Sequence, residues 1–126
     1  MTTSTPADLE SAVRRYFDLM YDCDVQHFDE VFHPTAQLHG MIGGQLTVWP
    51  NSAYREVLAN RIPPCAARAP REEEILLVDA VGDDQALVKV RVRIHDKVFV
   101  DHLSLLRTGG SWRITAKTFH LERVAS

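Results

Sequence analysis

Two groups of polar side chains in this sequence could do chemistry, and the first is a set of histidines. His27, His33 and His39 follow one another at intervals of six residues. Metal ligands usually lie three or four residues apart on a helix, or two apart on a strand. Because an interval of six fits neither spacing, and the sequence contains no zinc or calcium loop, we expect no metal site and no cofactor.

The second group lies near the end of the chain and consists of His102, Ser104 and Lys117. A histidine can transfer a proton near neutral pH, a serine hydroxyl can donate to a carbonyl oxygen, and a desolvated lysine has a lowered pKa. Each residue also has a structural interpretation, as a hydrogen-bonded histidine or serine of the core, or as a lysine whose amine reaches solvent. Catalysis therefore requires a fold that brings these side chains together.

The composition limits the class of protein. Of the 126 residues, 45% are hydrophobic and 25% are charged, which is typical of a soluble globular domain. A net charge of -3 argues against a nucleic-acid partner, and no apolar run is long enough to span a membrane. The N-terminus lacks the basic and apolar regions of a signal peptide. We therefore expect one domain over residues 1–126, in the cytoplasm, with Cys23 and Cys65 as free thiols.

Hydrophobic periodicity predicts three helices and about six strands. Residues 5–22 form the first helix, with Thr5 as the N-cap of a capping box. A short second helix follows Asp24, and a third is capped by Asn51 or Ser52. The expected strands are a hairpin around Gly43-Gly44, and then four strands at roughly 72–81, 86–95, 98–107 and 111–121.

This order of elements is typical of an α+β fold. The three N-terminal helices, with the hairpin between the second and the third, are expected to pack on a curved antiparallel sheet of about six strands. A curved sheet closed by helices forms a cone with an interior pocket. Such pockets usually hold small molecules, so the fold itself favours ligand binding.

The turns between the last strands predict which side chains face the pocket. We interpret Gly109-Gly110 as a two-residue turn and His95-Asp96-Lys97 as a three-residue connection. On the pocket face this register places Val90, Val92, Val100, His102, Ser104, Thr115, Lys117 and Phe119. On the opposite face it places Phe99, Leu103, Leu105, Trp112 and Ile114, beside Arg93 and a cross-strand ion pair of Arg91 with Asp101. A one-residue bulge would exchange the two faces.

The face opposite the pocket needs a cover of its own, because its apolar side chains would be exposed on a monomer. A second subunit is the simplest cover for such a surface. The sequence therefore predicts a homodimer that packs sheet to sheet. The residues expected in this interface are Phe99, Leu103, Leu105, Trp112 and Ile114.

Two stretches of the sequence resemble a known superfamily. They are YDCDVQHFDEVFHPTAQLHG at 21–40, with its Phe-His-Pro motif, and VFVDHLSLLRTGGSWRITAKTFH at 98–120, with Asp-x-Leu-Ser-Leu and Trp-Arg-Ile. With these motifs nearly the whole chain resembles the nuclear transport factor 2-like superfamily, and within it the putative lumazine-binding-like family. The resemblance implies the cone-shaped fold. Because the superfamily includes ketosteroid isomerases, polyketide cyclases and proteins that only bind, it leaves the function open.

The similarity to ketosteroid isomerases bears on one mechanism. In those enzymes a tyrosine of the first helix and a protonated aspartic acid of a late strand bind the oxyanion, while another aspartate is the base. The tyrosine position matches Tyr16, but the base position falls on Gly40 and the acid position on Ser104. The resemblance thus implies a ligand-facing Tyr16 hydroxyl without the usual isomerase mechanism. A packed core aromatic is the alternative for Tyr16.

These inferences lead to a hypothesis of a cofactor-independent protein that binds a small, hydrophobic, carbonyl-bearing molecule. The expected ligand contacts are Tyr16, Met20, His102, Ser104, Lys117 and Phe119. Tyr16, His102 and Ser104 are the candidate catalytic residues for a dehydration, isomerisation or cyclisation. The alternatives are a non-catalytic carrier, a dimeric protein-interaction module, and a structural dimer whose cavity is filled by its own side chains.

Overall fold

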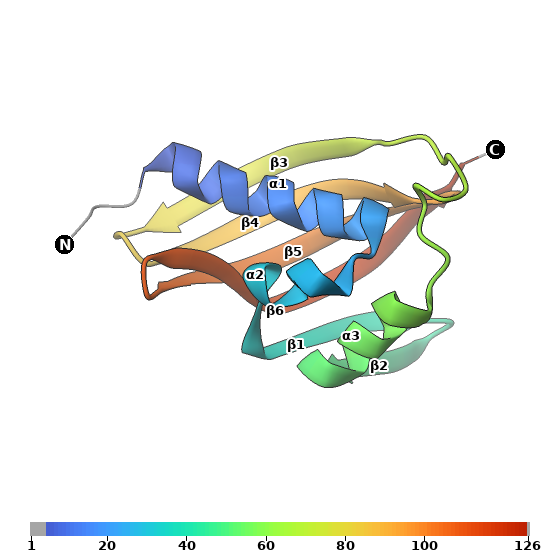
Figure 1. The fold of residues 1–126 in the computed structure, drawn as a ribbon, viewed down its shortest axis with the longest axis horizontal. Helices are drawn as coiled ribbons and strands as arrows, with labels where there is room; N and C mark the ends of the chain where they lie inside the picture. The colour runs from blue at the N-terminus through green and yellow to red at the C-terminus, as the bar shows by residue number, and fades with distance from the viewer. Residues whose placement is uncertain (1–4, 126) are drawn as a thin grey trace.

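The computed structural model of the chain is an α+β fold of three α-helices and one six-stranded sheet (Figure 1). It describes residues 5–125, so the ends of the predicted domain, residues 1–4 and 126, lie outside the described part. In chain order the elements are α1 (Pro6–Asp22), the short 3-10 helix η1 (Val25–His27), α2 (Phe28–Val31), β1 (Phe32–Ile42), β2 (Gln45–Pro50), α3 (Asn51–Asn60), β3 (Glu73–Val81), β4 (Gln85–Ile94), β5 (Lys97–Thr108) and β6 (Ser111–Val124). No helix among these residues is long and apolar enough to cross a membrane.

Helix α1 begins and ends where its sequence signals predict. The Thr5 hydroxyl accepts a hydrogen bond from the backbone N–H of Asp8 at 3.2 Å, and the Asp8 carboxylate accepts one from the N–H of Thr5 at 3.0 Å. This capping box satisfies two backbone donors that the helix leaves free. At the other end, Cys23 takes a left-handed conformation with φ of 51° and donates its N–H to Leu19. The predicted capping box is confirmed.

The sheet has the strand order β2-β1-β6-β5-β4-β3. After the β1–β2 hairpin, the chain passes through α3 to the far edge at β3 and then returns strand by strand to β1 (Figure 1). The neighbouring strands are antiparallel, except that β6 meets β1 in parallel. The predicted fold of three helices on a sheet of about six strands is confirmed, and the sheet is mixed because this one pair is parallel.

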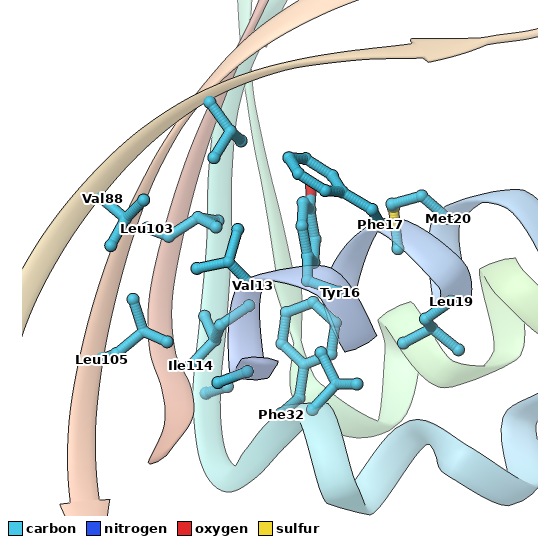
Figure 2. Packing of buried hydrophobic residues seen from close by; sticks show 14 of the residues in the cluster. Val13, Tyr16, Phe17, Leu19, Met20, Phe32, Val88, Leu103, Leu105 and Ile114 are labelled. Carbon is cyan, nitrogen blue, oxygen red and sulfur yellow. The ribbon is translucent and has the colours of Figure 1, made fainter. Parts of the chain in front are cut away.

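The core lies between α1 and one face of the sheet. Figure 2 shows Val13 and Tyr16 of α1 on the side of the helix that faces Leu103, Leu105 and Ile114 of the sheet. These side chains are almost fully buried. Burying an aliphatic side chain contributes about 1.5–3 kcal/mol each, so this layer is a major source of the stability that holds α1 in place.

The turn between β4 and β5 differs from the prediction. Ile94 pairs with Lys97, so only His95 and Asp96 form the turn, and His95 adopts a φ of 57°. A positive φ is uncommon for a residue with a side chain, although histidine tolerates it better than most. Because the connection has two residues instead of three, the register of the two strands shifts by one residue.

A bulge in β6 changes the other predicted register. The two-residue turn at Gly109-Gly110 is confirmed, since Thr108 pairs with Ser111. Leu105 pairs with Ile114, but Ser104 pairs with Ala116, so Thr115 is an extra residue on β6. An extra residue reverses the in–out alternation beyond it. Lys117 therefore shares a face with Ile114 and not with Ser104.

These two changes correct the predicted faces of the sheet. His102 and Ser104 are exposed on the face away from the helices, so their predicted place in the pocket is wrong. Asp101 takes that place, and Arg91 forms its ion pairs with Glu74 and Glu122 instead of Asp101. The five residues of the expected dimer interface lie on the helix side, where they belong to the chain's own core or pack against it: Phe99, Leu103, Leu105, Trp112 and Ile114. That surface is not available to a second subunit.

Candidate functional site

A cavity of about 340 Å³ opens between α3, the β1–β2 hairpin and the turn that joins β4 to β5. Its lining combines aromatic and charged side chains and includes Trp49, Tyr54, Arg61, Phe99, Asp101, Lys117 and Phe119. This volume lies at the lower end of the range of about 300–1,000 Å³ that is typical of small-molecule sites. The cavity is therefore large enough for a small ligand.

The aromatic wall is built by stacking. Trp49 of β2 stacks on Phe119 of β6 with ring centroids 5.5 Å apart, and on Tyr54 of α3 with centroids 5.6 Å apart. Beneath them, a Cβ added at Gly40 would fall 2.2 Å from the Phe119 ring. The sequence resemblance aligns Gly40 with the base of ketosteroid isomerases, and in this chain an aromatic ring occupies the space of a side chain at that position. The Phe119 ring leaves no room at Gly40 for a carboxylate side chain.

Four polar side chains meet at the base of the cavity, and we refer to Tyr16, Tyr54, Asp101 and Lys117 as the buried polar cluster. The Tyr16 hydroxyl donates to Oδ2 of Asp101 at 2.5 Å, and the Lys117 Nζ lies 3.8 Å from the same oxygen. Lys117 also donates to the Tyr54 hydroxyl at 3.3 Å. All four residues are at most 4% exposed. The cluster joins α1, α3, β5 and β6 in one hydrogen-bonded network.

The electrostatics of the cluster keep Tyr16 protonated. Burial raises the pKa of Tyr16 well above 10.0, and the negative charge of Asp101 raises this pKa further. The neutral hydroxyl can then donate to the carboxylate. The Lys117 ammonium lies 5.0 Å from the Tyr16 ring centroid and 5.1 Å from that of Tyr54, so two aromatic faces share its charge with Asp101.

Two polar atoms near the cavity lack a hydrogen-bond partner among the described residues. They are Oδ1 of Asp101 and Nη1 of Arg61, and both are buried. Both residues line the cavity. A buried acceptor and a buried donor without partners are costly, and such atoms are commonly satisfied by a ligand or by water. A ligand with a donor for Asp101 and an acceptor for Arg61 would satisfy both.

The structure brings together only part of the predicted site. Lys117 and Phe119 line the cavity, while Tyr16 and Met20 lie behind it and support the buried polar cluster from α1. Met20 accepts a hydrogen bond from the Tyr54 hydroxyl at 3.4 Å. His102 and Ser104 lie on the other face of the sheet and do not join these residues.

Sequence reasoning missed four residues of the site: Trp49, Tyr54, Arg61 and Asp101. A usable signal was present at Asp101, because Phe99, Asp101, Leu103 and Leu105 alternate as one face of a strand. A lone carboxylate in such an apolar row needs a partner. Arg61 follows the end of α3 directly, and no comparable pattern marks it.

The histidine set with the six-residue interval is divided between two elements, since His27 lies in η1 while His33 and His39 both lie in β1. His27 lies in η1 and contacts Glu30, while His33 lies in β1 and contacts Thr35. Within residues 5–125, no group of three or more His, Cys, Asp or Glu side chains is placed to hold a metal ion.

Comparison with known proteins places this geometry in a family. The putative lumazine-binding family matches residues 4–120 of the chain. A search of the curated proteins gives no match. Among solved structures, the chain is similar to a nuclear transport factor 2-like protein of unknown function from Silicibacter pomeroyi, with 25% identity, a TM-score of 0.80, and coverage of 92% of this chain and 94% of that one.

Two further structures share the fold at lower identity. One is a nuclear transport factor 2-like protein of unknown function from Shewanella baltica, with 22% identity, a TM-score of 0.81 and 93% coverage of both chains. The other is a ketosteroid isomerase-like protein from Erwinia carotovora atroseptica, with 16% identity, a TM-score of 0.71, and coverage of 93% of this chain and 95% of that one. The family match extends over nearly the whole chain, and the chain therefore belongs to the putative lumazine-binding family of the nuclear transport factor 2-like superfamily.

Proposed function

We propose that this protein binds a small, planar, carbonyl-bearing molecule in the cavity. The observation that carries this proposal is an aromatic-walled cavity that ends on a buried carboxylate with one unpartnered oxygen, Oδ1 of Asp101. Aromatic side chains favour a flat, conjugated ligand, and a few well-placed polar groups fix its orientation. The family description, which names lumazine, supports a ligand of this shape.

A second candidate function is acid–base turnover of the bound molecule. Asp101 supports it, because an unpartnered carboxylate oxygen at the cavity can accept a proton from a carbon or oxygen acid. Lys117, which also lines the cavity, can stabilise negative charge on a ligand oxygen. Tyr16 does not line the cavity, so its role here is to hold Asp101 by the 2.5 Å hydrogen bond. A carrier needs only to bind the molecule, so a test of turnover distinguishes a carrier from an enzyme.

Binding can be followed through Trp49, which lines the cavity. Wild-type protein is titrated with cyclic ketones, enones and lumazine, and both tryptophan fluorescence and heat are recorded. We expect saturable quenching that disappears in Trp49→Phe, because the remaining Trp112 is a core residue outside the cavity lining. Heat of binding should persist in that variant. No saturable signal in either readout for any compound would contradict the proposal.

Turnover is tested with Asp101→Asn, and His102→Ala is the matched control. The two residues are neighbours on β5 but lie on opposite faces of the sheet. If the protein is an acid–base enzyme, Asp101→Asn should lower kcat by about 100-fold or more, while His102→Ala should leave it unchanged. Binding without turnover of any compound by the wild type would favour the carrier.

A further inference from the structure

The cavity lining carries one more positive charge than negative charges. This inference rests on the proposed function and narrows its ligand class. We propose that Arg61 makes the cavity selective for an anion, so that the preferred ligand is a planar aromatic or conjugated carboxylate with a hydroxyl or N–H donor for Asp101.

Arg61 is held at the cavity by the end of α3. It is the first residue after the helix, and its backbone N–H donates to the carbonyl of Leu58 at 3.3 Å. Its Nη1 atom is buried and has no hydrogen-bond partner among the described residues. No carboxylate in residues 5–125 forms an ion pair with its guanidinium. A guanidinium that is partly removed from water and left unpaired is costly, which indicates a missing anionic partner.

The charges around the cavity leave Arg61 in excess. Lys117 and Asp101 form an ion pair 3.8 Å long and so cancel each other. At the mouth, the exposed side chains of Asp96 and Lys97 carry one charge of each sign. Only Arg61 remains without a counter-charge among these charged residues of the lining. One negative charge on the ligand would restore neutrality.

The neighbour of Arg61 on α1 does not supply that negative charge. The guanidinium contacts the thiol of Cys23, but burial raises the pKa of this thiol above its usual 9.0, and Arg61 only partly opposes this effect. Cys23 is therefore a neutral thiol near pH 7. Arg61 also influences Tyr16, whose pKa its charge lowers slightly against the larger effect of burial. The guanidinium is thus electrostatically coupled to the buried polar cluster while lacking an anion of its own.

The chemistry of the lining then defines the ligand. A carboxylate matches the planar, forked donors of a guanidinium better than a neutral carbonyl does. The stacked Trp49 and Phe119 rings offer a flat apolar surface beside it. A hydroxyl or N–H on the same ring system would donate to Oδ1 of Asp101. A cavity of about 340 Å³ limits such a ligand to one or two rings.

The test uses pairs of probes that differ only in charge. Para-hydroxybenzoate is compared with para-hydroxybenzamide, and a hydroxynaphthoate with its amide, by calorimetry at pH 7 and low salt. We expect each acid to bind wild-type protein about 10- to 100-fold more tightly than its amide, since a hydrogen bond to a charged group is the difference. Arg61→Gln should remove this preference, and Arg61→Lys should keep part of it. Arg91→Gln removes the same charge outside the cavity lining and should keep all of the preference.

The outcomes separate this inference from the proposed function. If the amides bind as tightly as the acids, or if Arg61→Gln keeps the preference while its thermal unfolding matches the wild type, the assignment of Arg61 is overturned and the binding cavity stands. If neither acids nor amides bind, and the ketone, enone and lumazine titrations also give no signal, the proposed function is overturned together with the inference.

Discussion

The ion pair between Asp101 and Lys117 leads to a quantitative prediction about stability. The two charges lie 3.8 Å apart, and their side chains are 1% and 5% exposed. At an effective dielectric constant of about 20, unit charges at this distance attract each other by about 4 kcal/mol. Removing one partner leaves the other charge buried without compensation, which typically costs about 3–5 kcal/mol.

The perturbation is Asp101→Asn and Lys117→Met, made singly and together. Each single variant should lower the free energy of unfolding by about 3–5 kcal/mol. The double variant leaves no unpaired charge, so it should lose no more than the worse single variant, with a coupling energy of about 3 kcal/mol. Met is chosen at 117 because its chain fills the aliphatic path of the lysine beside Met20.

The assay is urea unfolding at pH 7, followed by circular dichroism and tryptophan fluorescence, with the m-value as a check on two-state behaviour. Arg91→Met is the control, because its ion pair with Glu122 lies on the exposed face of the sheet, where solvent and salt screen such pairs. The reasoning would be refuted if the stability losses of the two single variants add up to the loss of the double variant within about 0.5 kcal/mol. If a single variant does not fold, recovery of folding in the double variant gives the same answer.

Further predictions concern the residues around the cluster and the outer face. The pKa of Tyr16 is raised in the folded protein, so Tyr16 stays neutral at a pH where an unfolded tyrosine ionises. The contribution of Tyr16 to the free energy of unfolding is therefore present below about pH 10 and is lost as the pH rises above that value. Tyr16→Phe should make the loss of stability at alkaline pH shallower than in wild type. Gly40→Ala should cost about 1–3 kcal/mol in urea unfolding and weaken ligand quenching of Trp49, since the Phe119 ring must move; unchanged values would contradict the packing described for Gly40. His102→Ala and Ser104→Ala should unfold at wild-type urea concentrations, as their side chains are exposed, and a large loss in either would argue against the register. The homodimer stays a prediction, and a mass of one chain in sedimentation equilibrium would contradict it.

Local sequence signals predicted the elements of this fold well. The capping box at Thr5, the glycine pairs in the hairpins and the alternation of the late strands each act over a few residues, so their physical effect can be read locally. The parallel contact of β1 with β6 could not be found in this way, because it depends on how many strands the chain forms before it returns.

The candidate site was predicted less well because it depends on register. Two single-residue features decided it: the turn at His95-Asp96 and the extra residue Thr115. Neither has a marker in the sequence, since His95 takes a positive φ without being glycine and Thr115 is an ordinary strand residue. A shift of one residue moved His102 out of the site and Asp101 into it. Lys117 lines the cavity, but its neighbours there are not the ones that the predicted register gave it.

The bulge at Thr115 also has a consequence for how proteins of this kind diverge. A point substitution changes one side chain of the cavity, whereas loss of the bulge at unchanged chain length, with Thr115 paired to Ser104, would turn Lys117 and Phe119 toward the opposite face together. One change of register would thereby remove both the charge partner of Asp101 and the Phe119 ring of the stacked wall. In this architecture a bulge decides which side chains of a strand face the cavity, so relatives should be compared by their bulges before they are compared by their residues.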